Sequence, residues 1–288
     1  MRPMCRLFGF RSILPSRVHR SVVAADSSIA RLSREHRDGW GVAYYVDGVP
    51  HLTKSPTAAF DDQIFHRLSG VVRSQTVLAH VRRATVGART VLNTHPFQYG
   101  RWVFAHNGEI ARFDEHREAL LEEVDPALRP YILGETDSEV LFYLLLTALR
   151  RDGHESGGEG VERLADAVRR TTDLVRTRCD RASGASSNLT VIVTDGRRML
   201  GAQGGRELHW STYKTRCPER EHCPYLARSC EAAAAHAEPV NHLLFASQPL
   251  SGENVWIAMQ PGEIVAVDGS MRLHRWPQAA ASIAFQST

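Results

Sequence analysis

A cysteine near the start of the chain could supply both the nucleophile and the base for amide cleavage. Cys5 lies in the segment Met4-Cys5-Arg6-Leu7. At a mature N-terminus its thiol could attack a carbonyl and its own α-amine could accept the proton. A free α-amine has a pKa of about 7.7–8.0, which suits a general base near neutral pH. This chemistry requires that residues 1–4 be removed or that translation begin at Met4. The alternative interpretation is an internal, inert cysteine.

An asparagine–glycine pair further along the chain could stabilise the oxyanion that such an attack creates. The pair lies in His106-Asn107-Gly108-Glu109. The Asn107 side-chain amide and the Gly108 N–H would donate to the oxyanion, and one such donor contributes about 2.7–4 kcal/mol elsewhere. Asn-Gly is also typical of a type I′ turn, so a hairpin tip is the structural interpretation of the same residues. The two interpretations are compatible, because a turn could present the donors.

Two charged residues could bind the amino-acid end of a substrate. Arg82 follows Leu78-Ala79-His80-Val81, and Asp137 lies in Gly134-Glu135-Thr136-Asp137-Ser138-Glu139. A guanidinium binds an α-carboxylate in a fork, and a carboxylate pairs with an α-ammonium. Arg82 and Arg83 are adjacent on a predicted strand, so only one of them should point into a pocket. A structural interpretation of Asp137 is also open, because an aspartate in the first turn of a helix stabilises the helix through its dipole. Thr136 and Glu139 match a capping box at this predicted helix start.

In order and spacing these motifs resemble the class II glutamine amidotransferases of the N-terminal-nucleophile (Ntn) type. The similarity is greatest to single-domain members such as the γ-glutamyl hydrolase of ergothioneine synthesis. It runs from Cys5 to about Gly269 and is densest before Val140. The resemblance implies an amidohydrolase that cleaves glutamine or a γ-glutamyl conjugate through a thioester on Cys5 and releases glutamate.

The resemblance also assigns site residues. It implies Cys5, Asn107 and Gly108 as catalytic residues. It implies that Arg82, rather than Arg83, binds the glutamyl group together with Thr85 and Asp137. Arg83 and Val86 depart from the tryptophan and histidine of the large synthase enzymes, so the identity of the amide stays open.

Three functional interpretations are compatible with these residues. The chain could be a free-standing γ-glutamyl hydrolase, or a glutaminase that passes ammonia to a separate synthase subunit. The third interpretation is not an enzyme: the chain could be a binding or regulatory protein that keeps the Ntn scaffold and is organised by Cys217, Cys223 and Cys230. Assays of glutamine beside γ-glutamyl dipeptides would separate the first two.

The composition is that of an ordinary globular protein. The 288 residues are 43% hydrophobic and 23% charged, and the net charge of +3 is mixed along the chain. This balance does not favour nucleic acid or a membrane surface as a partner. No apolar run approaches the roughly 20 residues of a membrane span, and the start lacks the apolar stretch of a secretion signal. We therefore expect a cytoplasmic protein that acts on a small molecule without a cofactor.

The cysteine pattern argues against a disulfide framework. The chain has five cysteines, and three of them, Cys217, Cys223 and Cys230, flank His222. Their spacing differs from the short spacers of structural zinc sites. We expect no metal here, and interpret residues 214–238 as a surface insertion of reduced thiols; a metal or redox role is the alternative.

The expected elements are strands first, then helices, then strands again. Strands are predicted at residues 5–11, 40–46, 51–54, 76–82, 102–106, 188–193, 199–202, 208–211, 242–247, 255–258 and 263–267, and helices at 18–32, 60–68 and within 114–178. The second and third strands should form a hairpin that turns at Asp47-Gly48. The helix after Asp137 should bury one apolar stripe, formed by Val140, Leu141, Leu144, Leu145 and Ala148. This order favours an α+β class over a parallel βαβ fold. The resemblance implies a four-layer αββα sandwich, formed by a single domain over residues 1–288. Trp40 is predicted in the core, and His80, His95 and His106 are predicted as hydrogen-bonded structural residues.

Overall fold

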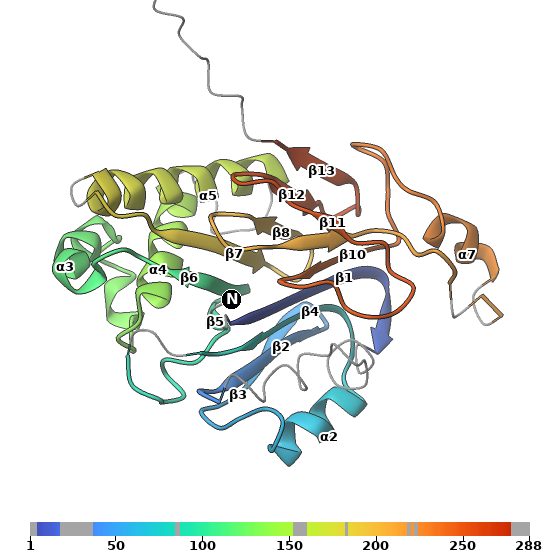
Figure 1. Cartoon of the computed structure of the whole chain (residues 1–288), viewed down its shortest axis with the longest axis horizontal. Helices are drawn as coiled ribbons and strands as arrows, with labels where there is room; N and C mark the ends of the chain where they lie inside the picture. The colour runs from blue at the N-terminus through green and yellow to red at the C-terminus, as the bar shows by residue number, and fades with distance from the viewer. Residues whose placement is uncertain are drawn as a thin grey trace, which may run out of the picture.

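Two antiparallel sheets packed face to face form the centre of the molecule (Figure 1). The computed structural model describes residues 5–17, 37–83, 87–151, 160–181, 184–217, 220–221 and 224–277. The first sheet has seven strands in the order β11-β9-β10-β1-β4-β2-β3. The second has six strands in the order β13-β12-β8-β7-β6-β5. The predicted α+β sandwich is confirmed.

The candidate site residues lie near the start of β1 and the ends of β4 and β6. The first sheet contains β1 (Arg6–Arg17), β2 (Trp40–Val46), β3 (Val49–Ser55), β4 (Arg73–Val81), β9 (His209–Ser211), β10 (His242–Ala246) and β11 (Ile257–Ala258). The second contains β5 (Phe97–Tyr99), β6 (Trp102–Glu109), β7 (Asn188–Thr194), β8 (Met199–Ala202), β12 (Ile264–Val267) and β13 (Leu273–Trp276).

Helices cover the outer face of each sheet. They are α2 (Gln63–Val71), α3 (Phe113–Glu123), α4 (Asp137–Arg151) and α5 (Val161–Val175). A further helix, α7 (Pro224–Cys230), projects at the edge of the molecule, and there are a 3₁₀ turn at Arg129–Tyr131 and a π-helical turn at Arg176–Asp180. Figure 1 shows α3, α4 and α5 on the side of the six-stranded sheet and α2 on the side of the seven-stranded sheet.

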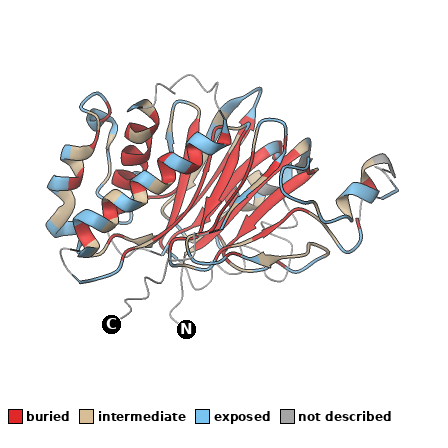
Figure 2. Cartoon of the chain, turned by 90° about the horizontal axis from the view of Figure 1, so that it is seen from above, coloured by how far each residue is buried: buried red, intermediate tan, exposed pale blue. Residues whose placement is uncertain are grey.

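Three apolar layers hold this stack together, and Figure 2 shows the buried strands beside helices whose outer sides are exposed. The outer layers pack α3–α5 against the six-stranded sheet and α2 against the seven-stranded sheet. The middle layer joins the two sheets through residues such as Leu7, Leu78 and Ala105. Successive side chains of β6 point to opposite faces of the sheet, so this strand contributes to two layers. Val103 and Ala105 face the other sheet, whereas Trp102 and Phe104 face the helices.

The hairpin from β2 to β3 turns where the sequence predicts. Asp47 and Gly48 both have positive φ, 51° and 79°, as a type I′ turn requires. Adding a Cβ at Gly48 would meet no atom within 4 Å, so it is the backbone conformation that favours glycine here. The local signal therefore fixed this turn.

Other predicted elements differ from the structure in ways that depend on distant contacts. Helix α4 was expected to bury one stripe, yet every residue from Asp137 to Thr147 is buried, because α3, α5 and the sheet surround it. The short strands β5 and β13 and the helix α7 were not predicted. The helix expected at residues 18–32 lies outside the described residues.

Candidate active site

Cys5 immediately precedes β1 and lies beside the end of β4. Arg6 pairs with Val81, which brings Cys5 next to the two residues after β4. The Arg83 N–H donates to the Cys5 Sγ at 3.1 Å, and the Sγ lies 3.3 Å from the Arg83 carbonyl oxygen. Burial raises the pKa of the Cys5 thiol, although the Arg83 N–H and the Arg82 charge act to lower it. The resting thiol is therefore protonated, and attack on a carbonyl requires a base.

Arg82 points inward and Arg83 outward. Their successive positions predict opposite directions, and the family resemblance selects Arg82 as the inner one. Arg82 is 3% exposed, whereas Arg83 is exposed. Backbone bonds hold this segment: the Arg82 N–H donates to the Gly39 oxygen at 2.8 Å, and the Asp38 N–H donates to the Arg82 oxygen at 3.3 Å. The strand end thus directs one guanidinium into the protein.

The Arg82 guanidinium lies among the other charged residues of the site. Burial lowers its pKa, and the Cys5 thiol, Asp38 and Asp137 act electrostatically to raise it. Its two terminal nitrogens donate to the carbonyls of Ala88 at 3.3 Å and Gly87 at 3.2 Å. Arg82 is therefore electrostatically coupled both to the candidate nucleophile and to the candidate carboxylate.

Asn107 and Gly108 lie inside β6, and the interpretation of this pair as a hairpin tip is wrong. Asn107 is paired with Thr190 and Gly108 with Leu189, both on β7. The Asn107 side chain is 2% exposed, and its amide nitrogen is buried with no hydrogen-bond partner among the described residues. A buried donor without an acceptor is costly, so such a group is unusual unless a ligand supplies the acceptor.

Gly108 is required by the close approach of the next strand. A Cβ at this position would lie 1.8 Å from the carbonyl oxygen of Asn188. No side chain can be accommodated against that fixed backbone atom. The glycine therefore has a packing reason of its own, whatever role its N–H has.

Asp137 begins α4 and joins the helix to the end of β6. Its carboxylate accepts from the Ile110 N–H at 2.7 Å, the Ser138 N–H at 2.7 Å and the Ser138 hydroxyl at 3.2 Å. A carboxylate can accept about four hydrogen bonds, so capacity remains for one more donor. Asp137 thus has a clear structural role and is also able to contact an ammonium group.

The predicted capping box is only half formed. The Thr136 hydroxyl accepts from the Glu139 N–H at 3.2 Å. The Glu139 carboxylate instead accepts from the N–H groups of Leu133 at 3.2 Å and Gly134 at 2.6 Å. Glu139 therefore orders the loop that precedes the helix, and Thr136 alone caps the first turn.

The prediction of hydrogen-bonded histidines is confirmed for His106 and wrong for His95. The His106 ring nitrogens lie 2.9 Å from the Ser138 hydroxyl and 2.8 Å from the Asn188 carbonyl. His95 is 5% exposed, its two ring nitrogens have no partner among the described residues, and its ring centroid lies 4.3 Å from that of His80. Burial lowers the pKa of His95 well below its usual range, so the ring is neutral.

Two glycines let backbone segments meet beside Arg82. Gly39 has a φ of 129°, and a Cβ at Gly41 would lie 2.1 Å from the His95 oxygen. Trp40 between them is fully buried and donates to Asp62 at 2.9 Å, which confirms its predicted core position. This segment therefore supports the site and offers no aromatic surface to a ligand.

Asn93 joins the two loops on either side of Arg82, a role that sequence reasoning missed. Its Nδ2 donates to the Ala88 oxygen at 3.0 Å, and its Oδ1 accepts from the Glu135 N–H at 2.8 Å. The signal available in the sequence was the motif Asn93-Thr94-His95-Pro96, but the two partners depend on the fold. Asn93 thereby fixes the loop that offers its carbonyls to Arg82.

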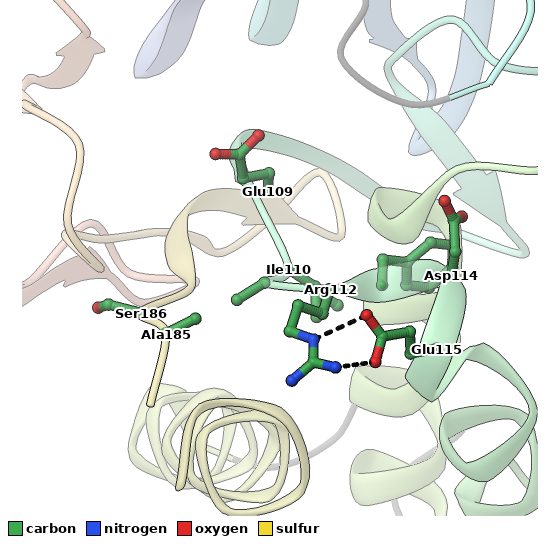
Figure 3. A pocket seen from close by; sticks show the side chains of 9 residues that line it. Glu109, Ile110, Arg112, Asp114, Glu115, Ala185 and Ser186 are labelled. Carbon is green, nitrogen blue, oxygen red and sulfur yellow. Dashed lines mark hydrogen bonds and ion pairs between the residues drawn. The ribbon is translucent and has the colours of Figure 1, made fainter. Parts of the chain in front are cut away.

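A groove of about 490 Å³ lies beyond the end of β6. It is lined by residues 109–115 together with Ala185 and Ser186. Figure 3 shows the Arg112–Glu115 ion pair in this groove, with Glu109 directed away from it. Because side chains alternate along a strand, Glu109 shares the face of Asn107. Cys5 does not line the groove, which therefore adjoins the polar cluster and is not its centre.

The remaining predicted residues are divided between described and undescribed parts of the chain. Thr85, Cys223 and His222 lie outside the described residues. Within the part that the structure describes, no group of three or more metal-binding side chains occurs, and no helix is long and apolar enough to cross a membrane. Cys5, Arg82, Asn107, Gly108 and Asp137 are all described, and they lie around one end of the two sheets.

Comparison with known proteins gives one family over nearly the whole chain. The family described as "Glutamine amidotransferases class-II" matches residues 4–286. The chain is 29% identical over 303 aligned residues to DUG3 of Saccharomyces cerevisiae, described as a probable glutamine amidotransferase, covering 92% of this chain and 82% of that protein. A shorter match is 41% identical over 76 residues to the gamma-glutamyl-hercynylcysteine sulfoxide hydrolase of Mycobacterium tuberculosis, covering 26% of this chain and 33% of that protein.

Solved structures of low sequence identity share the fold. A glutamine aminotransferase class-II domain protein from Silicibacter pomeroyi matches with a TM-score of 0.63 and 21% identity, covering 96% of this chain and all of that one (100%). Glutamine phosphoribosylpyrophosphate amidotransferase from Bacillus subtilis matches with a TM-score of 0.58 and 15% identity, covering 96% of this chain and 50% of that one. At this level of sequence identity, these similarities support only the fold, the two-sheet sandwich.

Proposed function

Since the chain belongs to the class II glutamine amidotransferases, we propose that it cleaves a γ-glutamyl amide through a thioester on Cys5. The observation that carries this proposal is the Asn107 amide nitrogen, which is buried and has no partner among the described residues. A tetrahedral intermediate would supply the missing acceptor. Asn107 and the Gly108 N–H are the proposed oxyanion donors.

The proposed reaction uses Cys5 twice. Its thiol attacks the γ-carbonyl carbon and transfers its proton to its own α-amine, and the carbonyl oxygen becomes the oxyanion. Collapse of the intermediate breaks the carbon–nitrogen bond, and the α-ammonium protonates the leaving amine. Water then attacks the thioester, releases glutamate and restores the thiol. The α-amine can act only if residues 1–4 are absent from the mature enzyme.

The glutamyl end of the substrate would be held by opposite charges. Arg82 is proposed to bind the α-carboxylate, and Asp137 the α-ammonium with its remaining acceptor capacity. The guanidinium now donates to two loop carbonyls at 3.2–3.3 Å. These contacts are long, so a carboxylate could replace them with shorter charge-assisted bonds. Thr85 is proposed as a third contact on the basis of the family motif.

The amine part of the substrate is proposed to be larger than ammonia, which makes the protein a γ-glutamyl hydrolase. The groove of about 490 Å³ beyond Gly108 could receive such a group, with Glu109 at its border. The proposal treats residues 1–288 as one domain that acts without a cofactor. A glutaminase that supplies ammonia to a separate synthase subunit is the alternative outcome of the test.

The test compares glutamine with γ-glutamyl dipeptides as substrates of the isolated chain. We expect glutamate release from the dipeptides with a higher kcat/KM than from glutamine. Intact mass of the active protein should correspond to a chain that begins at Cys5, and a glutamine-analogue electrophile should add one label to Cys5. An active enzyme that retains residues 1–4 would contradict the α-amine as base. Activity on glutamine alone would favour the ammonia donor.

A further inference from the structure

Two thiols lie on neighbouring segments at the edge of the fold, apart from the site of Cys5. Cys230 ends α7, which projects at the edge of the molecule opposite α3 (Figure 1). Hydrogen bonds bring the segment of Cys217 against the segment of Cys230, and the two thiols interact electrostatically. Both are free cysteines. The proposed cleavage of a γ-glutamyl amide does not use these thiols, and their chemistry is independent of it.

Hydrogen bonds on both sides of the thiols fix the two segments against each other. The Lys214 N–H donates to the Cys230 carbonyl at 2.7 Å, and the Cys217 N–H donates to Glu231 Oε1 at 2.8 Å. Arg220 also contacts the Glu231 carboxylate, at 2.9 Å. The segment of each cysteine is thus bonded to residues beside the other cysteine, so the fold sets the proximity of Cys217 and Cys230.

The two thiols are not equivalent. Cys217 is 6% exposed, whereas Cys230 is half-buried and therefore accessible. Burial raises the pKa of Cys230, but the Asn241 amide, which donates to its Sγ at 3.2 Å, and the Lys214 charge act to lower it. On balance the pKa of Cys230 is raised, so its greater exposure, and not thiolate character, makes it the first of the two thiols to meet an oxidant.

We propose that Cys217 and Cys230 form a reversible disulfide with a low-molecular-weight disulfide, such as oxidised glutathione, as the oxidant. The Cys230 thiolate attacks one sulfur of the oxidant, which expels a first thiolate and leaves a mixed disulfide on Cys230. The Cys217 thiolate then attacks the Cys230 Sγ, forms the internal disulfide and expels a second thiolate. The two protein thiols lose two protons and two electrons, and the oxidant becomes two thiols. Cys230 is the attacking residue and Cys217 the resolving one.

This site differs from a metal site made of all three clustered cysteines. The proposal needs only the two described thiols, and Cys223 and His222 have no part in it. The product would link the segment after β9 to the end of α7. One backbone hydrogen bond and one bond from the Cys217 N–H to the Glu231 carboxylate already hold this junction.

The experiment uses the full chain with Cys5→Ala, which removes the candidate nucleophile as a competing thiol. The protein is equilibrated with oxidised glutathione or with dithiothreitol, alkylated, digested and analysed by mass spectrometry. We expect a linked Cys217–Cys230 peptide pair that disappears on reduction. Cys217→Ser should trap glutathione on Cys230, and Cys230→Ser should leave Cys217 alkylatable.

Cys223→Ser is the matched control, because it removes the third clustered thiol and should leave the Cys217–Cys230 link intact. Circular dichroism of each variant shows whether it is folded. A link that runs through Cys223, or Cys230 that carries glutathione without ever closing on Cys217, would overturn the proposal. Stoichiometric zinc in the purified protein that protects all three thiols from alkylation would overturn it as well.

Discussion

Two groups of buried polar side chains, one at each end of the layer between the sheets, differ in how their hydrogen bonds are satisfied. At one end, the Asn107 amide nitrogen and the His95 ring have no partner among the described residues. At the other end, Asp195 accepts from two backbone N–H groups and from the Arg198 guanidinium, and the Tyr45 hydroxyl lies 2.7 Å from the Arg101 oxygen. These ends belong to the same strands, since β1, β4, β6 and β7 run through both.

The difference separates polar groups that hold the fold from those available to a ligand. A buried polar group with its hydrogen bonds made stabilises one arrangement of the chain. A buried donor without an acceptor lowers the stability of the fold, so its presence indicates a role other than stability, such as binding a ligand. On this view, substitutions at the Asp195 end should lower stability, and substitutions at the Asn107 end should lower activity.

The largest expected effect belongs to Cys5. Cys5→Ala should lower amidase kcat by roughly 10⁴-fold or more, because loss of a nucleophile removes the covalent route. The free energy of unfolding should change little, because this half-buried thiol packs in none of the three core layers. Cys230→Ala, assayed under reducing conditions, is the matched control and should retain activity. Substantial activity in Cys5→Ala would refute the thioester mechanism.

Asp195→Ala should have the largest effect on stability. Asp195 is 1% exposed and its carboxylate lies 2.8 Å from Arg198 Nη2, so the substitution removes the carboxylate that balances a buried positive charge. We expect the free energy of unfolding in denaturant titration to fall by about 3–5 kcal/mol. The kcat/KM per folded molecule should stay near that of the wild type. A matching loss of kcat/KM in folded protein would remove the distinction between the two ends.

Asn107→Ala should show the reverse pattern. Loss of one oxyanion donor lowers kcat by about 10²–10³-fold elsewhere, and we expect a similar decrease here. The free energy of unfolding should be unchanged or slightly higher, because the amide nitrogen makes no hydrogen bond among the described residues. Steady-state kinetics beside denaturant titration measures both. A destabilised variant with full activity would make Asn107 a structural residue.

The smallest expected effect is the pH dependence of stability from His242. This residue pairs with Ser12 at the same end of β1 as Arg11. Burial and the Lys214 charge lower the pKa of His242 to about 3, against about 6.5 in an unfolded chain. Between these values only the unfolded state binds the proton, so stability falls as the pH falls from 6.5 towards 3.

His242→Gln isolates that contribution. One such group changes the free energy of unfolding by about 1.4 kcal/mol per pH unit, so between pH 7 and 5.5 the wild type should lose roughly 1 kcal/mol more than the variant. His95, His106 and His209 also have lowered pKa values and remain in both proteins, so the difference reports His242 alone. Equal pH dependence of the two proteins would show that His242 titrates normally.

The sequence by itself determined the features that depend on neighbouring residues. The Asp47-Gly48 turn, the alternation of β6 and the start of α4 at Asp137 follow from local backbone preference and side-chain period. The order of the motifs also determined the family, because the residue types that amide cleavage needs recur in a fixed sequence. Adjacent positions were enough to predict that Arg82 and Arg83 point in opposite directions, and the family motif selected Arg82 as the inner one.

Only the tertiary structure decided the features that depend on distant partners. Asn107-Gly108 is a strand and not a turn because β7, some eighty residues later, pairs with it. Asp137 is held by Ile110, and Asn93 by Ala88 and Glu135, through hydrogen bonds that no local pattern encodes. The proximity of the segments of Cys217 and Cys230 has the same origin. A side chain's type limits what it can do, but whether its polar atoms are satisfied depends on which segments the folded chain brings against it.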